Sequence, residues 1–96
     1  MNRRYAVSYT KDARKTLQKL DPFIRKSLLS WTNTNLVGCT NPRQFGKGLT
    51  GDRSGQWRYR VGAYRIIAEI QDDKVLILVL AIGHRSSIYY LNSRKL

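Results

Sequence analysis

The sequence has 96 residues, enough for one domain with its own core but too few for two. Eighteen lysines and arginines against six acidic residues give a net charge of +12, which favours a polyanionic partner, nucleic acid first and an acidic protein second. The longest apolar run is too short to cross a membrane, the basic N-terminus lacks the apolar block of a secretion signal, and the one cysteine, Cys39, excludes an internal disulfide. We therefore expect a single cytoplasmic domain over residues 1–96.

The N-terminal part of the chain predicts a short strand followed by two helices. Alternation over residues 4–9 favours a strand, and Thr10 is suited to cap a helix after it. The apolar face of that helix is formed at helical spacing by Ala13, Leu17, Leu20 and Ile24. Asp21 and Pro22 suit the N-cap and first position of a second helix that runs to about Leu36. The residues of the second helix expected to point inward are Phe23, Leu28, Trp31 and Leu36.

The C-terminal part predicts a loop and three strands. Residues 37–54 are rich in glycine and read as a loop, without the spacing of a phosphate-binding loop. Residues 57–61, 64–71 and 75–82 predict strands, and their short connections favour an antiparallel meander with the first strand at an edge. The expected class is α+β, with an N-terminal helical hairpin packed on one face of a twisted, mainly antiparallel four-stranded sheet. The other face is expected to be at least partly open.

Positive charge gathers on the predicted open face. Strand alternation places Arg58 and Arg60 on one side of the sheet and leaves Trp57, Tyr59 and Val61 to the helices. Arg65 falls on the arginine side of the next strand. Like charges opposite each other destabilise a sheet, so the arrangement indicates a site that holds anions. Arginine suits phosphate because its planar fork makes bidentate contacts and stays charged.

A further polar group directly follows the most apolar strand: His84, Arg85 and Tyr89. Histidine exchanges a proton near neutral pH, and a tyrosine can donate a proton or stack on a base. No cluster of residues suggests a metal site, and we expect no metal and no cofactor. The set predicts metal-independent RNA cleavage, in which the 2′-hydroxyl attacks the adjacent phosphate while arginines stabilise the developing charge.

Several spaced motifs resemble a known family. After a helical pair come NPRQFGKGLTG, GQWRYRVGAYRIIAEI and GHRSSIY, in the order found in the RelE/ParE superfamily of bacterial toxins, and in the RelE branch in particular. The resemblance extends from Tyr5 to Tyr89. It implies an mRNA interferase that cuts the codon presented in the ribosomal A site. It also implies a cognate antitoxin that silences the toxin, contact with operator DNA only through the antitoxin complex, and no membrane partner.

The resemblance also implies roles for individual residues. Positions with catalytic roles in the family match Arg58, Arg60, Arg65, Arg85 and Tyr89, and RNA contacts are expected at Lys47, Arg53, Arg58 and Arg60. The best-known RelE toxins carry lysines where this chain has Arg58 and Arg60, and an arginine does not lose its proton. His84 is therefore the expected general base. The interval from Arg85 to Tyr89 is shorter than in that toxin, which leaves Tyr90 as an alternative.

Two other functions fit the same pattern. A ParE-like toxin shares the fold but inhibits DNA gyrase through a protein–protein contact, and it needs no acid–base residues. A non-catalytic RNA- or ribosome-binding module uses the arginines for affinity alone. The combination of arginines, histidine and tyrosine favours the interferase.

Overall fold

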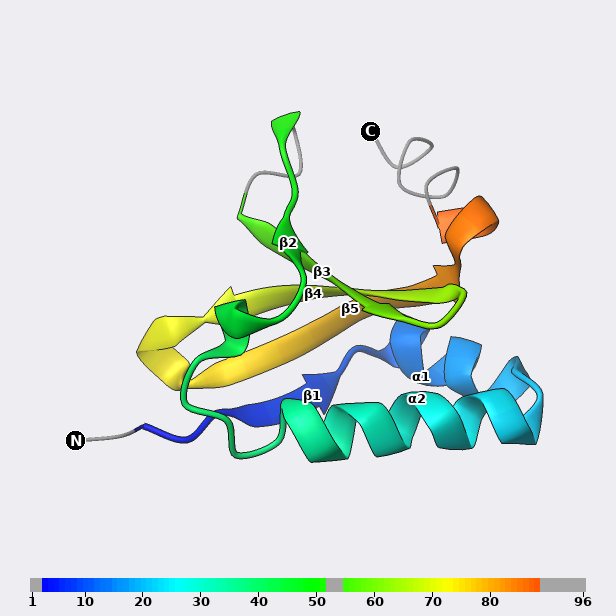
Figure 1. Ribbon diagram of the computed structural model, residues 1–96, viewed down its shortest axis with the longest axis horizontal. Helices are drawn as coiled ribbons and strands as arrows, with labels where there is room; N and C mark the ends of the chain where they lie inside the picture. The colour runs from blue at the N-terminus through cyan, green and yellow to red at the C-terminus, as the bar shows by residue number, and fades with distance from the viewer. Residues whose placement is uncertain (1–2, 52–54, 89–96) are drawn as a thin grey trace.

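The polypeptide forms one five-stranded sheet with two helices on one of its faces (Figure 1). The structure is a computed structural model, and it describes residues 3–51 and 55–88. Its elements are β1 (Ala6–Tyr9), α1 (Lys11–Lys19), α2 (Pro22–Asn35), β2 (Lys47–Gly48), β3 (Gln56–Val61), β4 (Tyr64–Gln71) and β5 (Leu76–His84). Short 3₁₀ turns cover Pro42–Gln44 and Asp72–Lys74, and residues 85–88 are helical.

The strand order is β1-β5-β4-β3-β2, with β1 parallel to β5 and every other neighbouring pair antiparallel. The α+β class, the helical hairpin on one face and the edge position of β1 are confirmed. The predicted count of four strands is wrong, because Lys47–Gly48 pairs with β3 inside the segment expected to be a loop. A two-residue strand beside glycines carries no alternation, so periodicity could not reveal it.

Both helix starts follow the predicted capping chemistry. The Thr10 hydroxyl accepts a hydrogen bond from the Ala13 amide at 3.1 Å, and the Asp21 carboxylate accepts one from the Phe23 amide at 2.8 Å. Pro22 occupies the first turn of α2, where its missing amide hydrogen costs nothing. The Thr10 hydroxyl also donates to the Leu80 carbonyl at 3.1 Å, where β5 bulges against β4. Thr10 therefore fixes α1 to the sheet as well as starting it.

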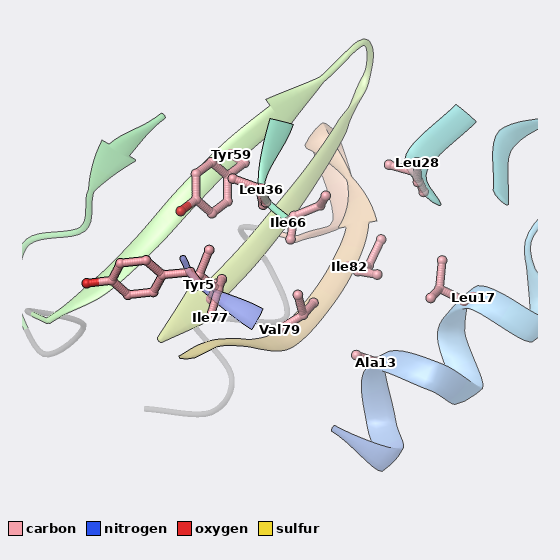
Figure 2. Packing of buried hydrophobic residues seen from close by; sticks show 11 residues of the cluster. Tyr5, Ala13, Leu17, Leu28, Leu36, Tyr59, Ile66, Ile77, Val79 and Ile82 are labelled. Atoms are coloured by element: carbon pink, nitrogen blue, oxygen red, sulfur yellow. The ribbon is translucent and has the colours of Figure 1, made fainter. Parts of the chain in front are cut away.

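The core lies between the helices and the sheet (Figure 2). Its buried side chains come from α1, α2 and the strands β3, β4 and β5, and include Ala13, Leu17, Leu28, Ile66, Ile77 and Val79. Tyr59 is fully buried, its ring centre lies 5.7 Å from that of Trp31, and its hydroxyl donates to the Pro42 carbonyl at 2.7 Å. Burial raises the pKa of Tyr59, so the phenol stays protonated and keeps donating this hydrogen bond.

One predicted core residue of α2 is wrong. Phe23 is 77% exposed, because the inward stripe of the helix begins one residue later, at the partly buried Ile24, and continues through the buried positions 28, 32 and 36. Thr32, which the sequence did not single out, is 1% exposed on this stripe. Leu28 and Leu36 are buried as predicted, and Trp31 packs against the core at its edge.

Asp72 joins three segments that are distant in sequence. Its carboxylate accepts a hydrogen bond from the Tyr5 hydroxyl at 2.6 Å, and two from the Arg43 guanidinium at 3.1 and 2.9 Å. The backbone carbonyl of Asp72 accepts from Arg3 at 2.6 Å. The hydrogen bonds from Arg43, followed by that from Tyr5, hold the pKa of Asp72 below its usual value.

Replacing Asp72 with asparagine should lower the free energy of unfolding at pH 7 by about 1 kcal/mol, since both partners of the ion pair are half exposed. A carboxylate whose pKa is lower in the folded state stabilises the fold above its unfolded pKa of about 3.9. That stabilisation disappears as the pH falls through the folded pKa. Urea unfolding of both proteins should therefore show a difference that shrinks between about pH 5 and pH 2. A difference independent of pH would contradict the role given to the ion pair.

Candidate functional site

Three arginines lie together on the face of the sheet that α1 and α2 leave uncovered. In the register of β3 and β4, Arg60 lies directly opposite Arg65, and Arg58 lies opposite Ile67. Tyr59, which alternates with Arg58 and Arg60, is buried on the helix side. The predicted shared face of the three arginines is confirmed, and we call it the arginine face.

The Arg60–Arg65 pair sits next to the turn between β3 and β4. The guanidinium of Arg65 donates to the backbone carbonyls of Gly62 at 3.1 Å and Tyr64 at 2.9 Å, which fixes its direction, while Arg60 is exposed. Two guanidinium groups placed opposite each other repel, so the pair is suited to share an anion. A phosphate between them would replace this repulsion by charge-assisted hydrogen bonds.

β2 adds a fourth cation to the arginine face. Lys47 lies opposite Arg58 in the β2–β3 register, and residues directly opposite each other point to the same side of a sheet. The strand is held close to β3, because the Trp57 indole donates to the Phe45 carbonyl at 2.6 Å. The structure thus brings together Lys47, Arg58, Arg60 and Arg65 from three adjacent strands.

His84 is not brought to this face. It lies opposite Tyr64 in the β4–β5 register, on the helix side, and its ring stacks edge-to-face on Tyr64 with centres 5.5 Å apart. Its Nδ1 accepts a hydrogen bond from the Ser86 amide at 3.2 Å and lies 2.8 Å from the Ser86 hydroxyl. His84 thereby caps the helical turn over residues 85–88.

The sequence analysis missed one hydrophobic residue, Ile88, which the helical turn over residues 85–88 brings to the arginine face. Ile88 is fully buried, and its Cδ1 would lie 3.2 Å from a β-carbon built on Gly83, which is opposite Arg65. Nothing in the local pattern marked Ile88 as buried, since its burial depends on the chain folding back after β5. The backbone amide of Arg85 donates to the Ala63 carbonyl at 2.8 Å, beside the β3–β4 turn.

The predicted site residues Arg53 and Tyr89, and the alternative Tyr90, lie outside the described residues.

Within residues 3–51 and 55–88, no group of three or more His, Cys, Asp or Glu side chains is placed to hold a metal ion. Neither helix there is long and apolar enough to cross a membrane. Cys39 is half-buried, and burial raises the pKa of its thiol, which fits a structural residue rather than a nucleophile.

Comparison with known proteins decides the family. The model of the ParE toxin of the type II toxin–antitoxin system parDE matches residues 7–89. The chain belongs to the RelE/ParE family of type II toxins. The toxin RelG of Mycobacterium tuberculosis is 32% identical over 85 residues, covering 88% of this chain and 95% of RelG. The toxin RelE of the same organism is 31% identical over 88 residues, covering 92% of this chain and 89% of that toxin.

Solved structures of RelE/ParE toxins share the fold. The toxin–antitoxin complex RelBE2 of Mycobacterium tuberculosis contains a chain that superposes with a TM-score of 0.78 at 28% identity, covering 88% of this chain and 97% of that one. The isolated RelE toxin of Escherichia coli superposes with a TM-score of 0.68 at 23% identity, covering 95% and 97%, and supports the fold alone. The predicted family resemblance is confirmed.

In this RelE/ParE toxin, Gly46 is expected to be essential for placing β2. Its φ of +76° suits glycine, and a β-carbon there would overlap the Arg58 carbonyl oxygen and lie 3.0 Å from the Trp57 indole nitrogen. Gly38 has a similar φ of +79° but open space around it, so Gly38→Ala is a matched control for the backbone strain alone. Gly46→Ala should therefore lower the Tm clearly more than Gly38→Ala in thermal unfolding. An equal decrease in Tm for the two variants would show that β2 can shift away from β3 without loss of stability, and would contradict this role of Gly46.

Proposed function

We propose that this type II toxin is a ribosome-dependent mRNA endoribonuclease that cuts the codon in the ribosomal A site. The observation that carries the proposal is the placement of Arg60 directly opposite Arg65 on an uncovered face that also holds Arg58 and Lys47. Repulsion between the two guanidinium groups destabilises the fold. A phosphate bound between them would relieve this repulsion and accept charge-assisted hydrogen bonds from both arginines.

The cleavage chemistry uses the RNA's own nucleophile. The 2′-hydroxyl attacks the adjacent phosphate, and Arg60 and Arg65 hold the non-bridging oxygens as negative charge builds up on them. Arg58 binds the neighbouring backbone. We also propose that the toxin uses Arg53, Arg85 and Tyr89 at the RNA, because these residues match functional positions of the family. DNA lacks the 2′-hydroxyl and is not cut by this route.

The partners follow from the relatives. Among the structural neighbours are RelBE2 of Mycobacterium tuberculosis, at 28% identity, and an archaeal RelE–RelB complex from Pyrococcus horikoshii, also at 28% identity, both of them toxin–antitoxin complexes. We infer that a cognate antitoxin neutralises this toxin in the cytoplasm. We also infer that the toxin contacts operator DNA only as part of the toxin–antitoxin complex. The net charge of +12 favours an acidic toxin-binding segment in that antitoxin.

A second candidate is inhibition of DNA gyrase by protein–protein contact. It is favoured by the family model, which describes the ParE toxin of the parDE system. A gyrase inhibitor does not require opposed arginines on an open sheet face, so we place it second.

Primer extension on an mRNA in a reconstituted translation reaction, with and without ribosomes, separates the candidates. The proposed function predicts cuts within codons that need the ribosomes. A gyrase supercoiling assay runs in parallel on the same preparation. An intact message together with loss of supercoiling would replace the proposal by the second candidate.

A further inference from the structure

We propose that Lys47 is the general base of the cleavage reaction, taking the proton from the attacking 2′-hydroxyl. This inference rests on the proposed function. It assigns to the residue on β2 a chemical role beyond that of an RNA contact, which is all that the sequence implied.

The other basic residues near the site do not fit this role. A guanidinium group effectively does not give up its proton in a protein, so Arg58, Arg60 and Arg65 are not suited to accept one. His84 lies on the opposite side of the sheet, and its proton-accepting Nδ1 is already engaged by the Ser86 amide. A lysine, in contrast, can act as a base once its ammonium group has lost a proton.

Glu69 is the competing proton acceptor on the arginine face. It lies opposite Gln56, four residues along β4 from Arg65, which corresponds to about 13 Å of strand. Lys47 lies opposite Arg58 on a strand about 5 Å away, and Arg58 is about 7 Å from Arg60 along β3, so the α-carbons of Lys47 and Arg60 are about 8 Å apart. The Glu69 carboxylate also accepts a hydrogen bond from the Gln71 side chain. The long lysine side chain is therefore the nearer acceptor to the Arg60–Arg65 pair.

The backbone around Lys47 is held in place. Gly46 approaches the Arg58 carbonyl more closely than any side chain allows, and a β-carbon on Gly48 would lie 3.1 Å from the Trp57 ring. The Trp57 indole is itself fixed by its hydrogen bond to Phe45. These contacts fix the α-carbon of Lys47, and so the position on β2 from which its exposed side chain extends over the arginine face.

The proposed step is balanced without any further reactant. The neutral amine of Lys47 takes the 2′ proton as the bond from O2′ to phosphorus forms. The bond from phosphorus to O5′ breaks, and O5′ takes a proton from water. The products are a 2′,3′-cyclic phosphate and a 5′-hydroxyl end, and the lysine ammonium returns its proton to solvent.

The test is single-turnover cleavage on ribosomes with a cleavable codon in the A site, at saturating toxin, from about pH 6.5 to pH 8.5. The wild-type rate should rise with pH, because only the deprotonated amine acts. Lys47→Arg keeps the charge and should still sediment with ribosomes, but should cut about 10²- to 10⁴-fold more slowly, without the rise. Lys15→Arg, the same exchange on the exposed side of α1, should behave as wild type.

Three outcomes would overturn the assignment while leaving the proposed function intact. One is a Lys47→Arg protein that cuts at the wild-type rate with the same pH profile. Another is loss of activity in Lys47→Ala but not in Lys47→Arg, which would show that Lys47 contributes only its positive charge and does not accept the proton. The third is loss of the reaction in Glu69→Gln, with a wild-type rate that does not change with pH. A wild-type protein that cuts nothing would instead remove the proposed function itself.

Discussion

Replacing Arg65 with alanine should reduce ribosome-dependent cleavage by about 10²- to 10³-fold, the loss typical of removing one donor that stabilises transition-state charge. Arg65 faces Arg60 across the strand pair, and its guanidinium is oriented by the carbonyls of Gly62 and Tyr64. A pre-oriented cation stabilises developing charge without reorganising during the reaction. Single-turnover rates at saturating toxin measure the effect on the chemical step.

Arg14→Ala is the matched control for this prediction. It removes the same charge from an exposed position on α1, on the other side of the sheet, and should leave the rate of cleavage unchanged. Both variants should unfold at temperatures close to that of the wild type, since neither residue belongs to the core. Equal losses in the two variants would mean that total charge matters and the arginine face does not.

Replacing Tyr59 with alanine should cost about 3–5 kcal/mol of unfolding free energy, the range for truncating a fully buried aromatic residue. Domains of this kind have about 5–15 kcal/mol in total, so the variant should be only marginally folded. Tyr59 lies between Arg58 and Arg60 on β3, with its ring against Trp31 and its hydroxyl bonded to Pro42. Its loss should loosen the strand that carries both arginines.

Phe23→Ala provides the control for aromatic truncation. Phe23 is 77% exposed, so the change should stay within about 0.5 kcal/mol of the wild type in urea unfolding. Tyr59→Phe isolates the hydrogen bond: it should cost about 1–3 kcal/mol, because the Pro42 carbonyl is left without its donor. A large loss at Phe23, or none at Tyr59, would contradict the description of the core.

Alternation along the chain was sufficient to predict most of the sheet. The period of two in β3 and β4 correctly separated Arg58, Arg60 and Arg65 from Tyr59, because each position is fixed by its immediate neighbours. The helix caps at Thr10 and Asp21 were predictable for the same reason, since capping is a contact over two or three residues.

Features that depend on contacts between distant segments escaped prediction. β2 forms only because Trp57 and the glycines let a short strand lie against β3. The side of the sheet on which His84 lies depends on the bulge in β5, which shifts the register between Ile67 and Ala68. A bulge of one residue exchanges the two faces of a strand, so alternation alone could not place the histidine.

The most direct test of the account uses two messages that differ in one atom. Each is bound to ribosomes with the same codon in the A site, and one carries a 2′-deoxyribose on the 5′ side of the scissile phosphate. The toxin should cut the all-ribose message at this codon and leave the deoxy-substituted codon intact. Cleavage of both messages would contradict attack by the 2′-hydroxyl, and cleavage of neither would contradict the assignment of the arginine face as a nuclease site.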